Sequence, residues 1–346
     1  MKKLLLILFV TSSTFVGAQV LQSDNFDALT LGNVGTDFTG LTAGQGNWFT
    51  LANNGAAPTT TTNAGNSNFQ IVASGASGQG VKIVGADGNK GSRFMFKNDL
   101  GTLWAARTPG NDIIEVEYDL YTGPASTSKD QYGLRLYGMD GASLRTLNGF
   151  VFNMDTKVLA GVAYLNNGGT FGTYLITLQT GGLILTADTW VRIGFAYDST
   201  TGETIWKTPT VYTGLPAANW AGPFVPTELD VISSTPSTNT AVSEVSFDRI
   251  TSKATAIEDL LGVAEVNAVD SFSIYPNPVK DVVTISNNNL QINKIAIIDI
   301  NGRTIKNVTV DNQTETQVNI SELNSGIYFL KVETNEGIST RKIVKQ

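Results

Sequence analysis

The sequence contains neither cysteine nor histidine in its 346 residues. The absence of cysteine excludes disulfide bonds, thiol catalysis, cysteine-ligated zinc and lipid attachment to a mature N-terminal cysteine. The absence of histidine excludes the Ser-His-Asp triad, the commonest general base and histidine-ligated metals. Any catalysis must therefore use carboxylates, Tyr, Lys or Arg, and any bound metal must be an oxygen-ligated ion such as calcium.

Charged residues are also scarce, at 15% of the chain, compared with about 25% in an average soluble domain. The net charge is −7, the isoelectric point is near 4.7, and Lys and Arg form no cluster. A nucleic-acid partner is therefore excluded. The 35 glycines, together with many Thr, Asn and Ser residues, predict short strands joined by turns. The chain is long enough for two domains.

Long hydrophobic runs are absent beyond the N-terminus, so we expect no transmembrane segment in the mature chain. The first residues combine Lys2 and Lys3 with the apolar run Leu4–Val10 and the small residues Gly17 and Ala18. This order predicts a signal peptide at residues 1–18 that directs the protein through the Sec pathway to the periplasm. The expected location is the outer-membrane surface or the medium.

An all-β domain is predicted for residues 19–254. Polar and apolar residues alternate along four segments, which are Ile113–Tyr121, Gly133–Tyr137, Trp190–Tyr197 and Val242–Ile250. Alternation of this kind indicates strands with one buried face. Gly-rich and Asn-rich turns separate the strands, while the polar stretch Ala52–Gly80 is predicted to form surface loops. This spacing is typical of a jelly-roll β-sandwich.

An acidic linker is predicted for residues 255–271, followed by a second β-domain at residues 272–346. Seven short alternating segments start at Ser273 and end at Val344, which predicts a small seven-stranded Ig-like β-sandwich. Asn301-Gly302 is a strong hairpin signal, because both residues tolerate the positive φ angles of a type I′ turn.

This C-terminal segment resembles the type A C-terminal sorting domain of the Bacteroidetes type IX secretion system. The matching residues are Tyr275, Pro276, Asn277, Pro278, Asp281, Asn301, Gly302, Gly326, Tyr328, Lys342 and Lys345. The resemblance implies two partners, the type IX translocon and a sortase-like protease that cleaves in the linker. The product is then anchored to surface lipopolysaccharide or released.

The first domain resembles the concanavalin A-like lectin and glucanase jelly rolls, in which the first and last strands pair. The similarity lies in the segments around Asp24, Asp27, Trp48 and Asp248 and in the strand that begins at Trp190. In this family, acidic residues at the paired strands hold a structural calcium, so Asp24, Asp27 and Asp248 are candidate ligands. The alternative is that these acids face solvent or cap turns.

Three carboxylates, Glu115, Glu117 and Asp119, share one face of a predicted strand. Paired carboxylates are what glycoside hydrolysis requires. However, the glucanases carry a further Glu a few residues on, where this chain has Leu120-Tyr121-Thr122-Gly123. The alternative interpretation is the polar outer face of a half-buried strand.

Two tryptophans are candidate glycan contacts, because an aromatic face stacks on the apolar face of a sugar. Trp104 with Arg107, and Trp220, lie in Gly- or Pro-containing stretches that read as loops. Trp190 and Trp206 lie in strand patterns and are predicted to be core residues.

Three functions follow as hypotheses. The first is a non-catalytic glycan-binding or adhesion module. The second is a polysaccharide-degrading hydrolase or lyase that uses the strand carboxylates. The third is a structural surface protein without a ligand.

Overall fold

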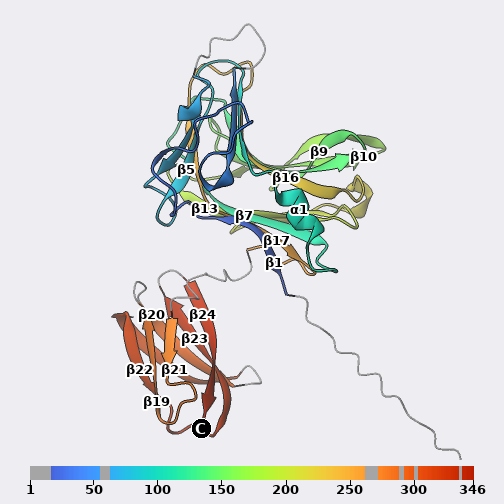
Figure 1. Cartoon of the computed structure of the whole chain (residues 1–346). Helices are drawn as coiled ribbons and strands as arrows, with labels where there is room; N and C mark the ends of the chain where they lie inside the picture. Colours follow the sequence, from blue (N-terminus) through green and yellow to red (C-terminus); the bar gives the residue numbers. More distant parts are fainter. Residues whose placement is uncertain (1–16, 55–62, 262–271, 288–291, 300–302, 335–336) are drawn as a thin grey trace, which may run out of the picture. The chain divides into compact units, whose positions relative to one another are not determined.

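The structure is a computed structural model that describes residues 17–54, 63–261, 272–287, 292–299, 303–334 and 337–346 (Figure 1). The chain divides into two compact units, Met1–Leu261 and Gly262–Gln346. We call them the cargo unit and the tail unit. In the described part of the chain, no helix has the length and apolar character needed to cross a membrane.

The first sheet of the cargo unit has nine strands. Eight of them follow the order β15-β14-β13-β7-β17-β5-β4-β2, and β1 pairs with β17. Their bounds, in this order, are Tyr212–Gly214, Thr204–Lys207, Trp190–Asp198, Ile113–Tyr121, Glu244–Thr255, Gly80–Val84, Phe69–Val72 and Gly32–Asn33, with β1 at Gln19–Asp24.

The second sheet has eight strands. Seven follow the order β11-β10-β9-β8-β16-β6-β3, and β12 pairs with β10. The bounds are Thr170–Ile176, Val158–Asn167, Ser143–Asn153, Gln131–Asp140, Val225–Ser234, Ser92–Phe96 and Phe49–Asn53, with β12 at Leu183–Ile184. The helix α1 spans Leu100–Ala105, and short 3-10 turns span Gln45–Asn47, Asn66–Asn68 and Ala217–Asn219.

The inner faces of the two sheets form one hydrophobic core. Tyr118 on β7 and Phe195 on β13 both pack edge-on against Phe150 on β9, with ring centroids 6.3 and 6.0 Å apart. Trp206 on β14 is fully buried and donates its indole N–H to the carbonyl of Gly149 at 2.7 Å. Edge-on aromatic contacts and a satisfied indole stabilise the packing of one sheet on the other.

The tail unit is a smaller sandwich of a three-stranded sheet, β18-β19-β22, and a four-stranded sheet, β21-β20-β23-β24. The bounds of β18 to β24 are Phe272–Tyr275, Val282–Asn287, Ile292–Asp299, Thr304–Gln313, Glu315–Asn319, Gly326–Thr334 and Gly337–Lys345. Alternating Ile, Val and Leu side chains from both sheets form its core. The expected all-β sandwich followed by a seven-stranded sandwich is confirmed.

Two local features differ from the sequence interpretation. The stretch expected to be surface loop contains β4, whose Phe69 and Ile71 are buried in the core. Residues 255–261, expected to start the linker, belong to the cargo unit. The expected pairing of the first and last cargo strands is present, since β1 runs antiparallel to β17 with Asp24 opposite Ile250.

Candidate functional site

The three strand carboxylates lie on the outer face of β7, and each is paired with a cation from a neighbouring strand. Glu115 lies 2.8 Å from the Lys253 ammonium and Glu117 lies 3.1 Å from the Arg192 guanidinium. Asp119 accepts hydrogen bonds from Arg249 at 2.5 and 3.0 Å and lies 3.4 Å from Arg192. Lys253 lies on β17 and Arg192 on β13, the two strands that flank β7.

The segment that follows β17 covers part of this row of charges. We call Ala256–Leu261 the strap. The backbone N–H groups of Asp259 and Leu261 donate to Glu115 at 2.5 Å and to Glu117 at 3.0 Å. Leu260 is fully buried. Burial raises the pKa of Glu115, and Lys253 opposes this shift. Carboxylates held by cations and covered by backbone are poorly placed to protonate a substrate.

The predicted aromatic contacts are largely enclosed. Trp104 lies in α1 with 2% of its surface exposed. Arg107 stacks over this ring at 4.3 Å and bonds to Asp112. Trp220 is half-buried, and its indole N–H donates to the carbonyl of Leu215. The Trp104 ring therefore has no free face for a sugar, and Arg107 is already occupied.

The acids expected to bind calcium accept hydrogen bonds from the protein itself. Asp24 accepts from the Trp48 indole at 2.7 Å and the Lys97 ammonium at 3.2 Å. Asp27 and Asp248 accept from backbone N–H groups of the loop 75–79, at 2.7 and 3.0 Å. No group of three or more metal-binding side chains occurs within the described ranges. This donor environment does not fit a calcium ion, which needs six to eight oxygen ligands.

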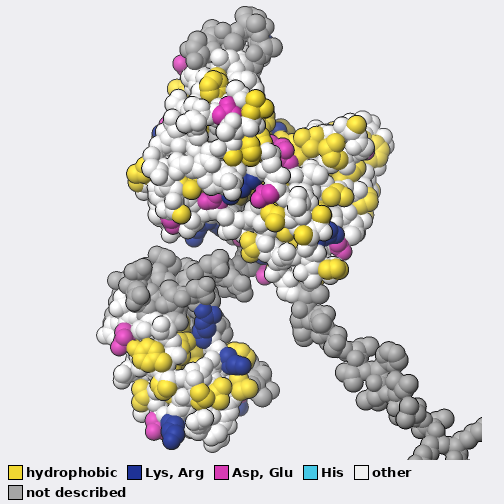
Figure 2. All heavy atoms as spheres, in the orientation of Figure 1, with side chains coloured by type: hydrophobic (Ala, Val, Ile, Leu, Met, Phe, Trp, Pro, Cys, Tyr) yellow, Lys and Arg dark blue, Asp and Glu magenta, His cyan; other side chains and the backbone are white. Residues whose placement is uncertain are grey.

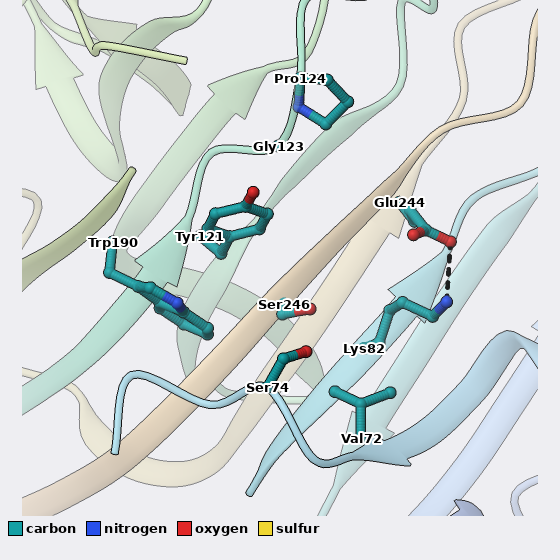
Figure 3. A pocket seen from close by; sticks show the side chains of 9 residues that line it. All are labelled: Val72, Ser74, Lys82, Tyr121, Gly123, Pro124, Trp190, Glu244 and Ser246. Atoms are coloured by element: carbon teal, nitrogen blue, oxygen red, sulfur yellow. Dashed lines mark ion pairs between the residues drawn. The ribbon is translucent and has the colours of Figure 1, made fainter. Parts of the chain in front are cut away.

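A small surface pocket of about 310 Å³ lies on the outer face of the first sheet (Figure 3). Trp190 on β13 and Tyr121 on β7 stand opposite each other in adjacent strands, with ring centroids 5.3 Å apart. Lys82 and Glu244 form a 2.9 Å ion pair on the other side of the pocket. The remaining lining is Val72, Ser74, Gly123, Pro124 and Ser246.

Hydrogen bonds and burial fix the aromatic wall of this pocket. The Tyr121 hydroxyl donates to Asp188 at 3.1 Å, and its pKa is raised by burial and by this carboxylate. The phenol therefore stays protonated. Trp190, predicted to be a core residue, is half-buried on the outer face. The signal was in the sequence: Trp190 has the same strand parity as Arg192, whereas Ile193 and Phe195 have the core parity.

In the tail unit, the motif residue Asn277 follows the first strand, β18, and forms hydrogen bonds with the last strand, β24. Asn277 donates to the carbonyl of Lys342 at 3.1 Å and accepts from the N–H of Val344 at 2.9 Å. The Asp281 carbonyl accepts from Ile320, and the Tyr328 hydroxyl donates to Asn324.

Three further motif residues lie on the strands β23 and β24. Gly326 begins β23, while exposed Lys342 and buried Lys345 lie on the edge strand β24. The turn Asn301-Gly302 lies outside the described residues.

A family model matches this part of the chain over residues 273–346, and its description is "Secretion system C-terminal sorting domain". The tail unit is a type IX sorting domain. This sorting domain marks the protein for export by the type IX machinery, either into the medium or onto the cell surface.

No curated protein sequence matches the chain. Among solved structures, an alginate lyase from a Chlorella virus is 14% identical, covering 53% of this chain and 88% of its own, with a TM-score of 0.39. A botulinum neurotoxin type C structure is 9% identical, covering 92% and 72%, with a TM-score of 0.43. The cellulose-induced protein Cip1 is 14% identical, covering 68% and 97%, with a TM-score of 0.41. At these values, the three similarities do not bear on what this protein does.

Proposed function

We propose that the cargo unit is a non-catalytic carbohydrate-binding module, which the sorting domain delivers to the cell surface or the medium. The observation that carries this proposal is the pocket with Trp190 and Tyr121 on one side and the Lys82–Glu244 pair on the other. An aromatic face can stack on a sugar ring while charged and hydroxyl groups bind its polar edge. The pocket volume suits a short stretch of saccharide, since ligand pockets start at about 300 Å³.

The charge environment of β7 favours binding over hydrolysis. Glycoside hydrolysis needs one carboxyl group that keeps a proton and a second that acts as base or nucleophile. Glu115, Glu117 and Asp119 instead form a row of ion pairs with Lys253, Arg192 and Arg249. Cross-strand ion pairs of this kind stabilise a sheet.

A glycan array probed with residues 17–261 tests the proposal, together with titrations of cellohexaose, xylohexaose and laminarihexaose. Binding without release of reducing ends is expected. Trp190→Ala removes most of the affinity, because it deletes the stacking surface. Tyr212→Ala is the matched control: it removes an aromatic of the same sheet that is 56% exposed and outside the pocket.

Three other results would each point elsewhere. Release of reducing ends that is lost in Glu117→Gln would favour a polysaccharide-degrading enzyme. No binding to any saccharide would favour a structural surface protein. Equal affinity of the Trp190→Ala and Tyr212→Ala variants would place the binding site outside the pocket.

The route of export is the second part of the proposal. Residues 1–18 act as the signal peptide for the inner membrane, and the sorting domain acts at the outer membrane. A sortase-like protease then removes the sorting domain. Deletion of residues 273–346 is expected to leave the cargo in the periplasm, as measured by cell fractionation and surface labelling. Surface delivery of the truncated protein would contradict this assignment.

A further inference from the structure

The outer face of the eight-stranded sheet carries a second group of polar side chains, far from the charge row on β7. On β16, Leu229 and Val231 point into the core, so Glu228, Asp230 and Ile232 belong to the opposite face. Asp230 and Ile232 are nevertheless only 4% and 2% exposed. Side chains on a non-core face are this strongly buried only where neighbouring side chains pack around them.

Two buried polar atoms in this cluster lack a hydrogen-bond partner among the described protein atoms: Asp230 Oδ1 and Arg135 Nε. Arg135 on β8 lies directly opposite Asp230 on β16, and Tyr137 lies opposite Glu228. Leaving a buried polar atom without a partner destabilises the folded state. A buried group without a partner calls for an explanation, and a hydrogen bond to a bound ligand would provide one here.

Glu228 and Asp230 lie two residues apart on β16, so their carboxyl groups share one face of the strand. Burial is the main reason that the pKa of Asp230 is raised, and the Glu228 charge adds to the shift while Arg135 opposes it. Glu228, Arg135 and Tyr137 are half-buried, whereas Asp230 is buried. The surface therefore presents a carboxyl group, a guanidinium and a phenol, which together can donate and accept hydrogen bonds.

Aromatic rings flank this polar cluster. Phe96 on β6 is directly opposite Asp230, and its ring stacks on that of Phe49 on β3 at 5.6 Å. Both rings are half-buried. Figure 2 shows hydrophobic and acidic side chains among mostly uncharged polar groups on one face of the cargo unit. A polar centre beside an aromatic platform is the arrangement expected for a polyhydroxylated ligand.

We propose that Glu228, Arg135 and Tyr137 form a second saccharide-binding site, with Phe96 and Phe49 as its stacking surface. Sugar hydroxyls both donate and accept, so they match a mixed set of donors and acceptors. The outer faces of two packed sheets point away from each other. The cargo unit therefore binds saccharide on two opposite faces, which lets one molecule bridge two polysaccharide chains. This inference extends the carbohydrate-binding function proposed above to a separate site.

Hydrogen–deuterium exchange of the full chain with saturating cellohexaose, xylohexaose or laminarihexaose tests the second site without any variant. Slower exchange is expected in β8 and β16 as well as near Trp190. Protection only near Trp190 would overturn the second site and leave the first. Protection only in β8 and β16 would support the second site and overturn the pocket. No protection with any of the three probes would overturn both sites.

Substitutions then assign the two sites independently. Glu228 is half-buried, so Glu228→Ala is expected to fold normally. The affinity of the second site is expected to fall tenfold or more in this variant, so that β8 and β16 are no longer protected from exchange. In the same variant, protection near Trp190 stays unchanged. Trp190→Ala gives the reciprocal result. Asp155→Ala is the matched control, because this acid lies in an exposed turn of the same sheet. Retention of the β16 protection in Glu228→Ala would refute the assigned contacts.

Discussion

The strap allows a test of which contacts hold the C-terminal end of the cargo unit in place. Leu260 is fully buried in a small apolar cluster with Ala196 and Ile205, although it lies beyond the last strand. Burial of a leucine side chain contributes about 1.5–3 kcal/mol, and each backbone N–H bonded to a carboxylate adds about 1.5–3 kcal/mol. The two bonds and Leu260 therefore contribute about 5–9 kcal/mol in total.

Ordering the six residues of the strap opposes this gain, at about 1–2 kcal/mol for each backbone. The two sums are close, so the strap is only marginally held. Leu260→Ala removes about 2–3 kcal/mol, which corresponds to roughly a 30- to 150-fold increase in the opening equilibrium. We expect the backbone amides of Asp259 and Leu261 to exchange faster, until they reach the rate of an open chain, and the endoproteinase Glu-C to cut after Glu258.

Ile257→Ala is the matched control, since this side chain is in the same segment and is 77% exposed. Its exchange rates are expected to stay at the wild-type values. The midpoint of global unfolding should change little in either variant, because the strap lies outside the main core. Unchanged exchange at Asp259 and Leu261 in Leu260→Ala, or equal effects of both substitutions, would refute the idea that Leu260 fastens the strap.

Four further outcomes are expected. Burial raises the pKa of Asp248 to about 6, above the unfolded value of about 3.9. The folded state therefore binds this proton more tightly, and its stability falls as the pH rises between these values. Asp248→Asn should remove this contribution to the pH dependence of the thermal unfolding midpoint between pH 4 and pH 6. Gly161→Ala places a methyl group 2.6 Å from the buried Trp206 ring and should lower the free energy of unfolding, measured in urea, by about 1–3 kcal/mol. In the control Gly214→Ala, the added methyl group is 3.7 Å from its nearest neighbour, so the free energy of unfolding should not change. Asn277→Ala removes both bonds to β24 and should lower the unfolding midpoint of the isolated tail unit and the exported fraction, as measured by immunoblot. Chelation of calcium should leave the cargo midpoint unchanged, because the acids are bound to protein donors; a drop on addition of EDTA would contradict this.

The elements that could be predicted are those whose signal is local. Ile113–Tyr121 was predicted with the bounds that β7 has, because its alternation is uninterrupted. The tail unit was predicted as a sandwich of seven short strands, since turns separate them and most pair with a strand nearby in the chain. β4 was missed, because the four residues Phe69–Val72 are too short a run to stand out in a polar stretch.

The chemistry of the site was less predictable, because it depends on strand register. Glu115 looks like a free carboxylate in the sequence, yet register places Lys253 opposite it from a strand well over a hundred residues away. Trp104 lies in a stretch that reads as a loop, but α1 turns its ring into the core. Similarly, the placement of Arg135 opposite Asp230 follows only from the pairing of β16 with β8. No local pattern reports such pairings.

The position of β17 links the chemistry of the cargo unit to its export. β17 is the last cargo strand, yet it lies inside the sheet, where it pairs with β7 on one side and with β5 and β1 on the other. The chain therefore leaves the cargo unit from an interior strand. The strap that follows is bonded to Glu115 and Glu117 through its backbone N–H groups. A cut beyond Leu261 would leave every strand pair of the cargo intact. By this argument Glu115 and Glu117 fasten the end of the cargo unit, and the proposed saccharide sites are assigned to other residues on the outer faces of both sheets.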